Sequence, residues 1–193
     1  MSACRDLSGE SRKQSSLVEE WFKRLGGKEF PKDTDQRVER YFKEMEVKRN
    51  YAKFTAFETK LDEMIIINKI KIFSFCEHHL LPFFGHCSVG YIPNGKILGL
   101  SKFQRLVDSV STLPTLQEDV TEAIANKVEK LLSPKGLGVT MNCQHSCMFG
   151  RGIERPEISV SSQVLRGQFK DNHSMRQEFL TGRKNNGQNA LCN

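Results

Sequence analysis

The sequence has no long apolar segment and no signal of export. None of the apolar runs in its 193 residues approaches the ~20 residues that a membrane-spanning helix needs. The N-terminal stretch MSACRDLSGESRKQSS contains no apolar core of the kind that secretory signals carry. Internal repeats are also missing. We therefore expect a cytoplasmic protein with no membrane partner.

Cysteine is present, but it does not follow the pattern of a disulfide scaffold. A chain of this length can bury enough apolar surface to fold without disulfide bonds. Cys4 and Cys192 lie in polar tails and are predicted to be free thiols. Cys87 and Cys143 lie in strand-like segments and are predicted to be small buried apolar residues. Of the six cysteines, this leaves two with a different role.

The composition is that of an ordinary globular chain, with 38% hydrophobic and 27% charged residues. A net charge of +6 favours an anionic partner, either a phosphorylated metabolite or a nucleic acid. The basic residues are spread along the chain and are not gathered in a stripe with interleaved aromatics. Nucleic-acid binding is therefore the weaker interpretation, and we expect none.

The N-terminal part of the chain is predicted to be an extension of the main domain. Residues 1–12 are polar and are predicted to be disordered, and residues 13–60 are predicted to form a helical arm. Apolar residues at helical spacing predict one helix from Ser15 to Gly26 and a second helix from Thr34 onward. The arm has too little apolar surface to fold alone.

Residues 61–182 are predicted to form an α+β catalytic domain, followed by a mobile tail at 183–193. Isoleucine- and phenylalanine-rich segments indicate strands, and Pro or Gly residues mark where the helices end. The predicted order is strands at 64–75 and 87–92, helices that begin at Ser101 and Leu116, strands at 138–145 and about 158–168, and a short helix at 175–181.

The order strand-strand-helix-helix-strand-strand has a consequence for assembly. Four strands with both long helices on one side leave unpaired strand edges, which are a liability unless another chain covers them. We therefore expect an oligomer in which sheets join edge to edge.

Three residues are candidate metal ligands: Cys76, His79 and Cys147. Each alone would be interpreted as an ordinary core residue. Together they offer three ligands, which leave the fourth zinc position to water, as in catalytic sites. Zinc lowers the pKa of bound water from about 15.7 to about 7. If the strand that ends at His145 continues, His145 and Cys147 point to the same face.

Two more histidines stand beside these ligands. His78 and His145 are one and two residues away from ligands, so they can reach a bound water or a substrate. Histidine titrates near neutrality, which suits proton transfer. The alternative is that one or both only support the metal ligands.

Basic residues at two places are candidates for binding an anion. Ser101, Lys102 and Arg105 open a helix, whose N-terminal amides attract phosphate. For so short a motif, an ordinary capped helix is the commoner interpretation. Arg151 lies four residues beyond Cys147 and would bring a cation near the metal, although a lone arginine is more often a surface residue.

Glu118 has two competing interpretations. With Thr115 it forms the pattern of a capping box at the start of a helix. The alternative is a carboxylate that accepts hydrogen bonds from the N–H donors of a purine base. The residues alone leave both open.

The segments FSFCEHHLLPFFG, GLSKFQRLVD, LQEDVTEAI, QHSCMFGRG and RQEFL together resemble the GTP cyclohydrolase I family, over about residues 34–180. The resemblance implies a tunnelling fold, in which the sheets of several subunits close into an oligomeric barrel. It also implies a homo-oligomer, typically a decamer of two pentamers, with active sites at the subunit boundaries. This agrees with the argument from strand edges.

The resemblance also implies a reaction and roles for individual residues. Zinc-activated water attacks C8 of the guanine ring of GTP, which gives formate and 7,8-dihydroneopterin triphosphate, a precursor of pterins and folates. The implied zinc ligands are Cys76, His79 and Cys147, and the implied proton carriers are His78 and His145. Glu118 and Gln117 are implied to hold the guanine. The implied contacts to the triphosphate or ribose are Ser101, Lys102, Arg105 and Arg151, with Arg37 and Arg40 reaching into a neighbouring subunit's site.

Two other functions are compatible with the same scaffold. One is a different tunnelling-fold enzyme, such as a nitrile reductase that uses a cysteine nucleophile and a nicotinamide cofactor. The other is a non-catalytic scaffold subunit. The paired histidines and the second candidate zinc cysteine favour the cyclohydrolase.

Overall fold

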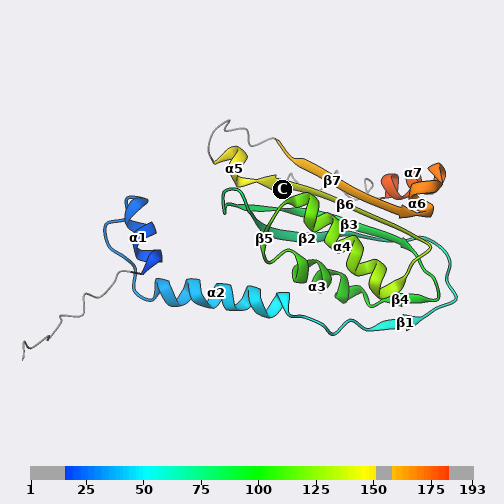
Figure 1. The fold of residues 1–193 in the computed structure, drawn as a ribbon, viewed down its shortest axis with the longest axis horizontal. Coiled ribbons are helices and arrows are strands. Elements are labelled where there is room, and N and C mark those ends of the chain that lie inside the picture. Colours follow the sequence, from blue (N-terminus) through cyan, green and yellow to red (C-terminus); the bar gives the residue numbers. More distant parts are fainter. Residues whose placement is uncertain (1–15, 151–157, 183–193) are drawn as a thin grey trace, which may run out of the picture. The chain divides into compact units, whose positions relative to one another are not determined.

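The computed structural model describes residues 16–150 and 158–182 (Figure 1). By the contacts among its residues, the chain divides into two compact units, one up to Glu44 and one from Met45 onward. The segments predicted to be disordered or mobile, 1–12 and 183–193, lie outside the described residues.

The two predicted N-terminal helices are present: α1 lies in the first unit, and α2 runs from the first unit into the second. Helix α1 (Leu17–Arg24) is capped by Ser16, whose hydroxyl accepts the Glu19 N–H at 3.2 Å. After α1 the chain turns at Gly26, whose φ of 86° is unfavourable for residues that carry a side chain. Helix α2 (Thr34–Arg49) begins where the sequence predicts it.

The second unit is built on a five-stranded sheet with the strand order β5-β2-β3-β6-β7. Neighbouring strands are antiparallel, except that β5 runs parallel to β2. A separate two-stranded ladder joins β1 (Ala56–Glu58) to β4 (Lys96–Leu98). The strands of the main sheet are β2 (Ile65–Cys76), β3 (Pro82–Ile92), β5 (Pro114–Thr115), β6 (Gly136–His145) and β7 (Val160–Gly167).

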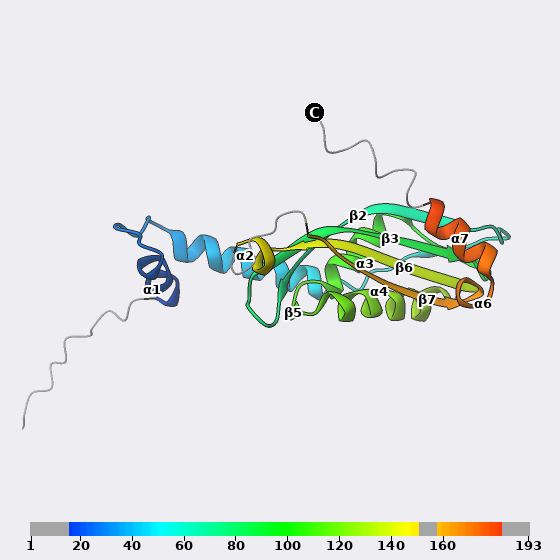
Figure 2. The same ribbon diagram turned by 90° about the horizontal axis from the view of Figure 1, so that it is seen from above.

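Helices α3 (Leu100–Val110) and α4 (Gln117–Leu132) cover one face of this sheet (Figure 2). Phe103, Leu106 and Val107 are fully buried on α3, at the i, i+3, i+4 spacing of a helix face. Alternate residues of β3 and β6, such as Val89 and Val139, face them. Each fully buried apolar side chain of this kind stabilises the fold by about 1.5–3 kcal/mol.

The opposite face is covered at one end by α6 (Gln168–Asp171) and α7 (His173–Gly182). The rings of Phe169 and Phe179 stack there with centroids 5.3 Å apart. A Cβ at Gly90 or Gly138 would come within 2.4–2.5 Å of the Phe179 ring. These two strand positions therefore admit only glycine while the aromatic pair stays in place.

The mixed α+β fold and the predicted order of the long strands and helices are confirmed. Within residues 16–150 and 158–182, the elements that were not predicted are short, namely β1, β4, β5, α5 (Ser146–Phe149) and α6, and β3 begins five residues earlier than predicted. No helix among the described residues has the length and apolarity of a membrane span.

Candidate active site

A tight loop at the end of β2 brings two candidate ligands together. Cys76 is the last residue of the strand, and its N–H donates to the Leu81 carbonyl at 2.9 Å. The Leu80 N–H returns to the Cys76 carbonyl at 2.8 Å, with Leu80 in the left-handed region at a φ of 52°. The chain therefore folds back on itself within five residues, which places His79 beside Cys76.

Strand pairing brings the third ligand to the same place. Strand β3 begins at Pro82, opposite Phe75 of β2, and its next residue, Phe83, pairs with His145 at the end of β6. The ends of β2 and β6 thus lie on either side of the start of β3. The strand ends at His145, as predicted, and does not continue: α5 begins at Ser146, and Cys147 lies in this short helical turn, so the alternation of a strand does not determine where Cys147 points.

The ligand atoms of Cys76, His79 and Cys147 all lie within 4.8 Å of one another. A tetrahedral zinc ion with bonds of about 2.0–2.3 Å would hold such atoms about 3.3–3.8 Å apart. The group therefore fits zinc if the three side chains move slightly closer together. Cys76 is buried, Cys147 is half-buried and His79 is exposed. Soft thiolates together with an imidazole favour zinc over magnesium or calcium.

Two other cysteines of the sheet differ from these ligands. Cys87 and Cys143 are both 1% exposed in the core, as the sequence predicts. Burial raises the pKa of the Cys87 thiol, and it raises that of Cys143 to about 12. Both therefore remain neutral thiols at neutral pH and are poor metal ligands.

His145 is held beside the metal group by two contacts. Its ring stacks on Phe83, with centroids 4.6 Å apart and planes 9° apart. Its Nε2 lies 2.9 Å from Oε1 of Gln117, the first residue of α4. Burial lowers the pKa of the His145 imidazole, and the negative charge of Glu118 opposes this shift.

The hydrogen bonds of Gln117 determine which ring nitrogen of neutral His145 carries the proton. The amide nitrogen of Gln117 donates to the Val160 carbonyl at 2.9 Å and to the Ser162 hydroxyl at 3.0 Å. A carbonyl only accepts, so the amide cannot be flipped without losing this bond. Oε1 therefore faces His145, and Nε2 of the neutral ring must be the donor. In that state Nδ1 is the basic nitrogen.

Glu118 is exposed in the first turn of α4, where the helix dipole favours a carboxylate. Of the two interpretations of Glu118, the capping box does not hold: Leu116 is the N-cap residue, and its side chain makes no cap hydrogen bond. Thr115 instead lies in β5, and its hydroxyl donates to the Leu116 carbonyl at 3.3 Å. The carboxylate of Glu118 is thus not used as a cap.

His78 is exposed next to His79, and their rings meet edge to face with centroids 6.2 Å apart. The loop that carries both residues is tied to β5, because the Glu77 N–H donates to the Thr115 carbonyl at 3.3 Å. His78 therefore belongs to the same cluster as the three candidate ligands.

The predicted phosphate-binding residues gather at a different place. Helix α3 begins after Gly99, so Ser101 lies inside the first turn and is not the cap that the sequence suggested. Lys102 and Arg105 both donate to the hydroxyl of Tyr51, each at 2.8 Å. Tyr51 was not among the predicted site residues, because no sequence motif marks it.

The start of α3 is far from the metal group of the same chain. Gln104 of α3 hydrogen-bonds the N–H and the carbonyl of Lys71 at the edge of β2, both at 3.0 Å. Cys76 is five residues further along β2, which is about 16 Å at about 3.3 Å per residue. Helix α3 starts beside β4 and ends toward β5 (Figure 1). One chain therefore does not bring Lys102 and Arg105 to its own cysteines.

Three further residues were predicted to contact the substrate. Arg37 and Arg40 are on α2, where the Arg37 guanidinium donates to the Lys32 carbonyl at 2.8 Å and to the Thr34 hydroxyl at 2.9 Å. Arg151 lies outside the described residues.

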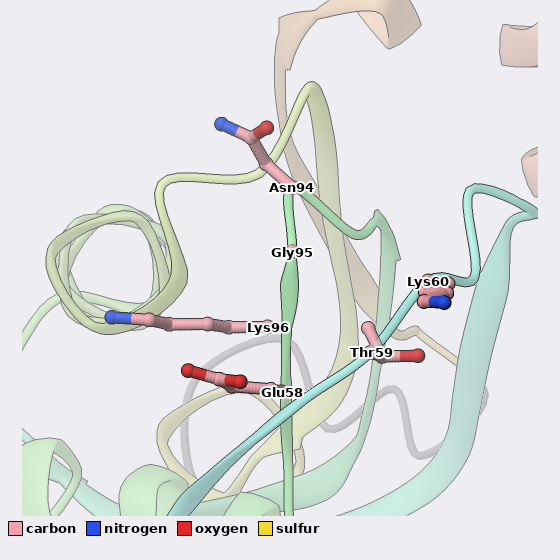
Figure 3. Close-up of a pocket in the computed structure, with 6 residues that line it drawn as sticks. All are labelled: Glu58, Thr59, Lys60, Asn94, Gly95 and Lys96. Carbon is pink, nitrogen blue, oxygen red and sulfur yellow. The ribbon is translucent and has the colours of Figure 1, made fainter.

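An open hollow lies near the β1–β4 ladder (Figure 3). None of the predicted site residues lines it, and it contains no cluster of metal-binding side chains. The residues that line it are Glu58, Thr59, Lys60, Asn94, Gly95 and Lys96.

Several known proteins are similar to this chain. The model of the family described as GTP cyclohydrolase I matches residues 13–184. A GTP cyclohydrolase 1 from Chromohalobacter salexigens is 46% identical over 125 residues, which cover 65% of this chain and 68% of that protein. A GTP cyclohydrolase 1 from Aquifex aeolicus is 43% identical over 156 residues, covering 77% of this chain and 82% of the relative. The solved apo structure of an archaeosine synthase, QueF-Like, is 23% identical with a TM-score of 0.43, covering 54% of this chain and 93% of that one.

Proposed function

The chain belongs to the GTP cyclohydrolase I family, and on this premise we propose that it is a zinc-dependent enzyme that hydrolyses GTP at guanine C8. The products are formate and 7,8-dihydroneopterin triphosphate. The observation that carries the proposal is the convergence of Cys76, His79 and Cys147 within 4.8 Å, beside a histidine of fixed orientation.

Cys76, His79 and Cys147 hold the metal in this proposal. When bound, zinc supplies acidity to water, whose pKa it lowers to about 7. The loop hydrogen bonds at Cys76 and the helical turn at Cys147 fix the two sulfur atoms before a metal binds. The site is therefore largely preformed, which reduces the ordering that binding requires.

His145 and His78 move protons at the guanine ring. Because burial lowers the pKa of His145, its ring is neutral at neutral pH and can accept a proton at Nδ1. His78, exposed on the loop after β2, can exchange a proton with solvent. The two histidines come from different strand ends, so they can approach the ring from different sides.

Glu118 and Gln117, adjacent on α4, take different roles. Guanine presents N–H donors along one edge, and the exposed carboxylate of Glu118 can accept them. Gln117 is 1% exposed, and both hydrogens of its amide are already used within the protein. We therefore assign Gln117 as a positioning residue for His145 and not as a direct guanine ligand.

The triphosphate is bound by cations of a neighbouring subunit. The separation of about 16 Å along β2 keeps Lys102 and Arg105 from the metal group of their own chain. The outer edges of β2 and β7 offer backbone groups for joining a second copy. The proposal thus includes a homo-oligomer with a barrel of joined sheets, as in a decamer of two pentamers. Ser101, Arg151, Arg37 and Arg40 are further candidates for substrate contacts there.

The test is turnover of GTP by the purified protein, measured as released formate and as a pterin chromophore. We expect turnover to disappear after chelation and to return when zinc is added. Zinc-loaded protein that leaves GTP unchanged would contradict the proposal. Tight binding of a reduced nicotinamide cofactor in that case would favour the nitrile reductase alternative.

A further inference from the structure

Two cations and one phenol meet at the start of α3. The Tyr51 hydroxyl accepts hydrogen bonds from Lys102 Nζ and Arg105 Nη1, each at 2.8 Å, and donates to the Lys53 carbonyl at 2.7 Å. The Arg105 guanidinium also lies over the Tyr51 ring, 5.0 Å from its centroid. One side chain therefore contacts both cations.

The position of Lys102 is unfavourable for the helix itself. Lys102 lies in the first turn of α3, where the helix dipole repels positive charge, and this turn contains no acidic residue. Among the described residues, neither Lys102 nor Arg105, one turn further along, forms an ion pair with a carboxylate. Two like charges held together on one tyrosine without a carboxylate partner indicate a site that is made for an anion.

The ring of Tyr51 is itself held in place by packing. Its ring meets Phe54 edge to face, with centroids 5.2 Å apart, and Phe54 packs against the main core. The proton of the hydroxyl is directed to the Lys53 carbonyl, so the lone pairs of the oxygen face the two cations. The hydrogen bond from Lys102 is the main reason that the pKa of Tyr51 is lowered.

From these contacts we propose that Tyr51 is a positioning residue that pre-orients Lys102 and Arg105 for the triphosphate of the substrate. This inference rests on the proposed function, because it assigns a further residue to the same substrate site. Lysine and arginine side chains lose much rotamer freedom when they bind a phosphate. Because the Tyr51 hydroxyl already restricts both side chains in the free protein, less rotamer entropy is lost when the phosphate binds.

The experiment compares the zinc-loaded oligomer with its Tyr51→Phe variant, which keeps the ring and its contacts and removes only the hydroxyl. We expect KM for GTP and Kd for inorganic tripolyphosphate to rise about threefold to tenfold, the size of an exposed hydrogen bond to a charged group. We expect kcat to change less than about twofold, because the lost contact orders the cations and does not touch the reacting atoms.

Two further variants separate positioning from a general loss of structure. Tyr41→Phe makes the same change on α2, in a residue without a role in the site, and should leave both constants unchanged. In a Lys102→Met background, Tyr51→Phe should lose part of its effect, because the two residues act through one contact. Full additivity of the two changes would overturn the inference.

The outcomes also distinguish the inference from the function on which it rests. Normal GTP turnover with unaltered KM and tripolyphosphate affinity in Tyr51→Phe would overturn the role of Tyr51 alone. A fall in kcat at constant KM would likewise overturn it. A wild-type protein that neither hydrolyses GTP nor binds tripolyphosphate would overturn the function together with the inference.

Discussion

Two pairs of cysteines, one inside the main sheet and one where its strands end, have different environments. Cys87 and Cys143 lie within long strands, where neighbouring strands and helices exclude water and keep the thiols neutral. Cys76 and Cys147 lie where β2 and β6 end, and a histidine stands near both. In the proposed function, position relative to the strand ends, more than residue type, therefore distinguishes a core cysteine from a candidate metal ligand.

The largest effect is expected at the strand ends. Cys76→Ser should remove bound zinc and lower GTP turnover by more than about a hundredfold, because the loss of a residue that only supports a metal ligand already costs about tenfold to a hundredfold. Metal analysis and formate release measure the two effects. A Cys76→Ser protein with full zinc content and normal turnover would remove the distinction between the two pairs.

The next effect concerns the residue that orients His145. Gln117→Met should lower kcat about tenfold to a hundredfold, as loss of an orienting partner does, with zinc content unchanged. The ¹⁵N shifts of His145 should also show loss of the single Nε2–H form. Gln163→Met, on the exposed face of β7, is the matched control. An equal fall in both variants would point to a structural effect only.

A smaller effect is expected at Glu118. Glu118→Gln should raise KM for GTP about tenfold, since hydrogen bonds to a charged group contribute about 1.5–3 kcal/mol and the amide keeps part of them. Asp119→Asn removes a charge from the same helical turn and controls for the helix dipole. If the two variants raise KM equally, Glu118 has no specific contact with the base.

The smallest effect on activity is expected in the strand interior. Cys87→Ser buries a hydroxyl in an apolar site and should cost about 1–3 kcal/mol of unfolding free energy. Zinc content and turnover of the folded protein should not change. Urea unfolding provides the first measurement and the assays above provide the others. Loss of zinc in this variant would mean that the core cysteines also take part in metal binding.

The sequence predicted best what depends on local pattern. The isoleucine-rich run 64–75 became β2 (Ile65–Cys76), and the apolar spacing after Leu116 became α4. Strands of two or three residues, such as β5, have no period that could be recognised. The capping-box interpretation of Thr115 and Glu118 does not hold because α4 begins at Gln117, which makes Leu116 the N-cap and leaves Thr115 one residue before it.

Site residues were predictable where adjacent residues carry the chemistry, as in Cys76 and His79. The contact of Gln117 with His145 depends on where α4 lies against β6 and β7, which no local pattern encodes. Tyr51 reaches Lys102 across 51 residues of sequence. The separation of the cations from the metal group became visible only when the direction of α3 along β2 was known.

The most direct test of the central claim is the X-ray absorption spectrum at the zinc edge of the purified protein. We predict two sulfur atoms at about 2.3 Å together with nitrogen or oxygen at about 2.0–2.1 Å, and one sulfur fewer in any zinc that Cys76→Ser retains. Zinc surrounded by nitrogen and oxygen alone, or by the same two sulfurs in Cys76→Ser, would contradict a site built from Cys76, His79 and Cys147.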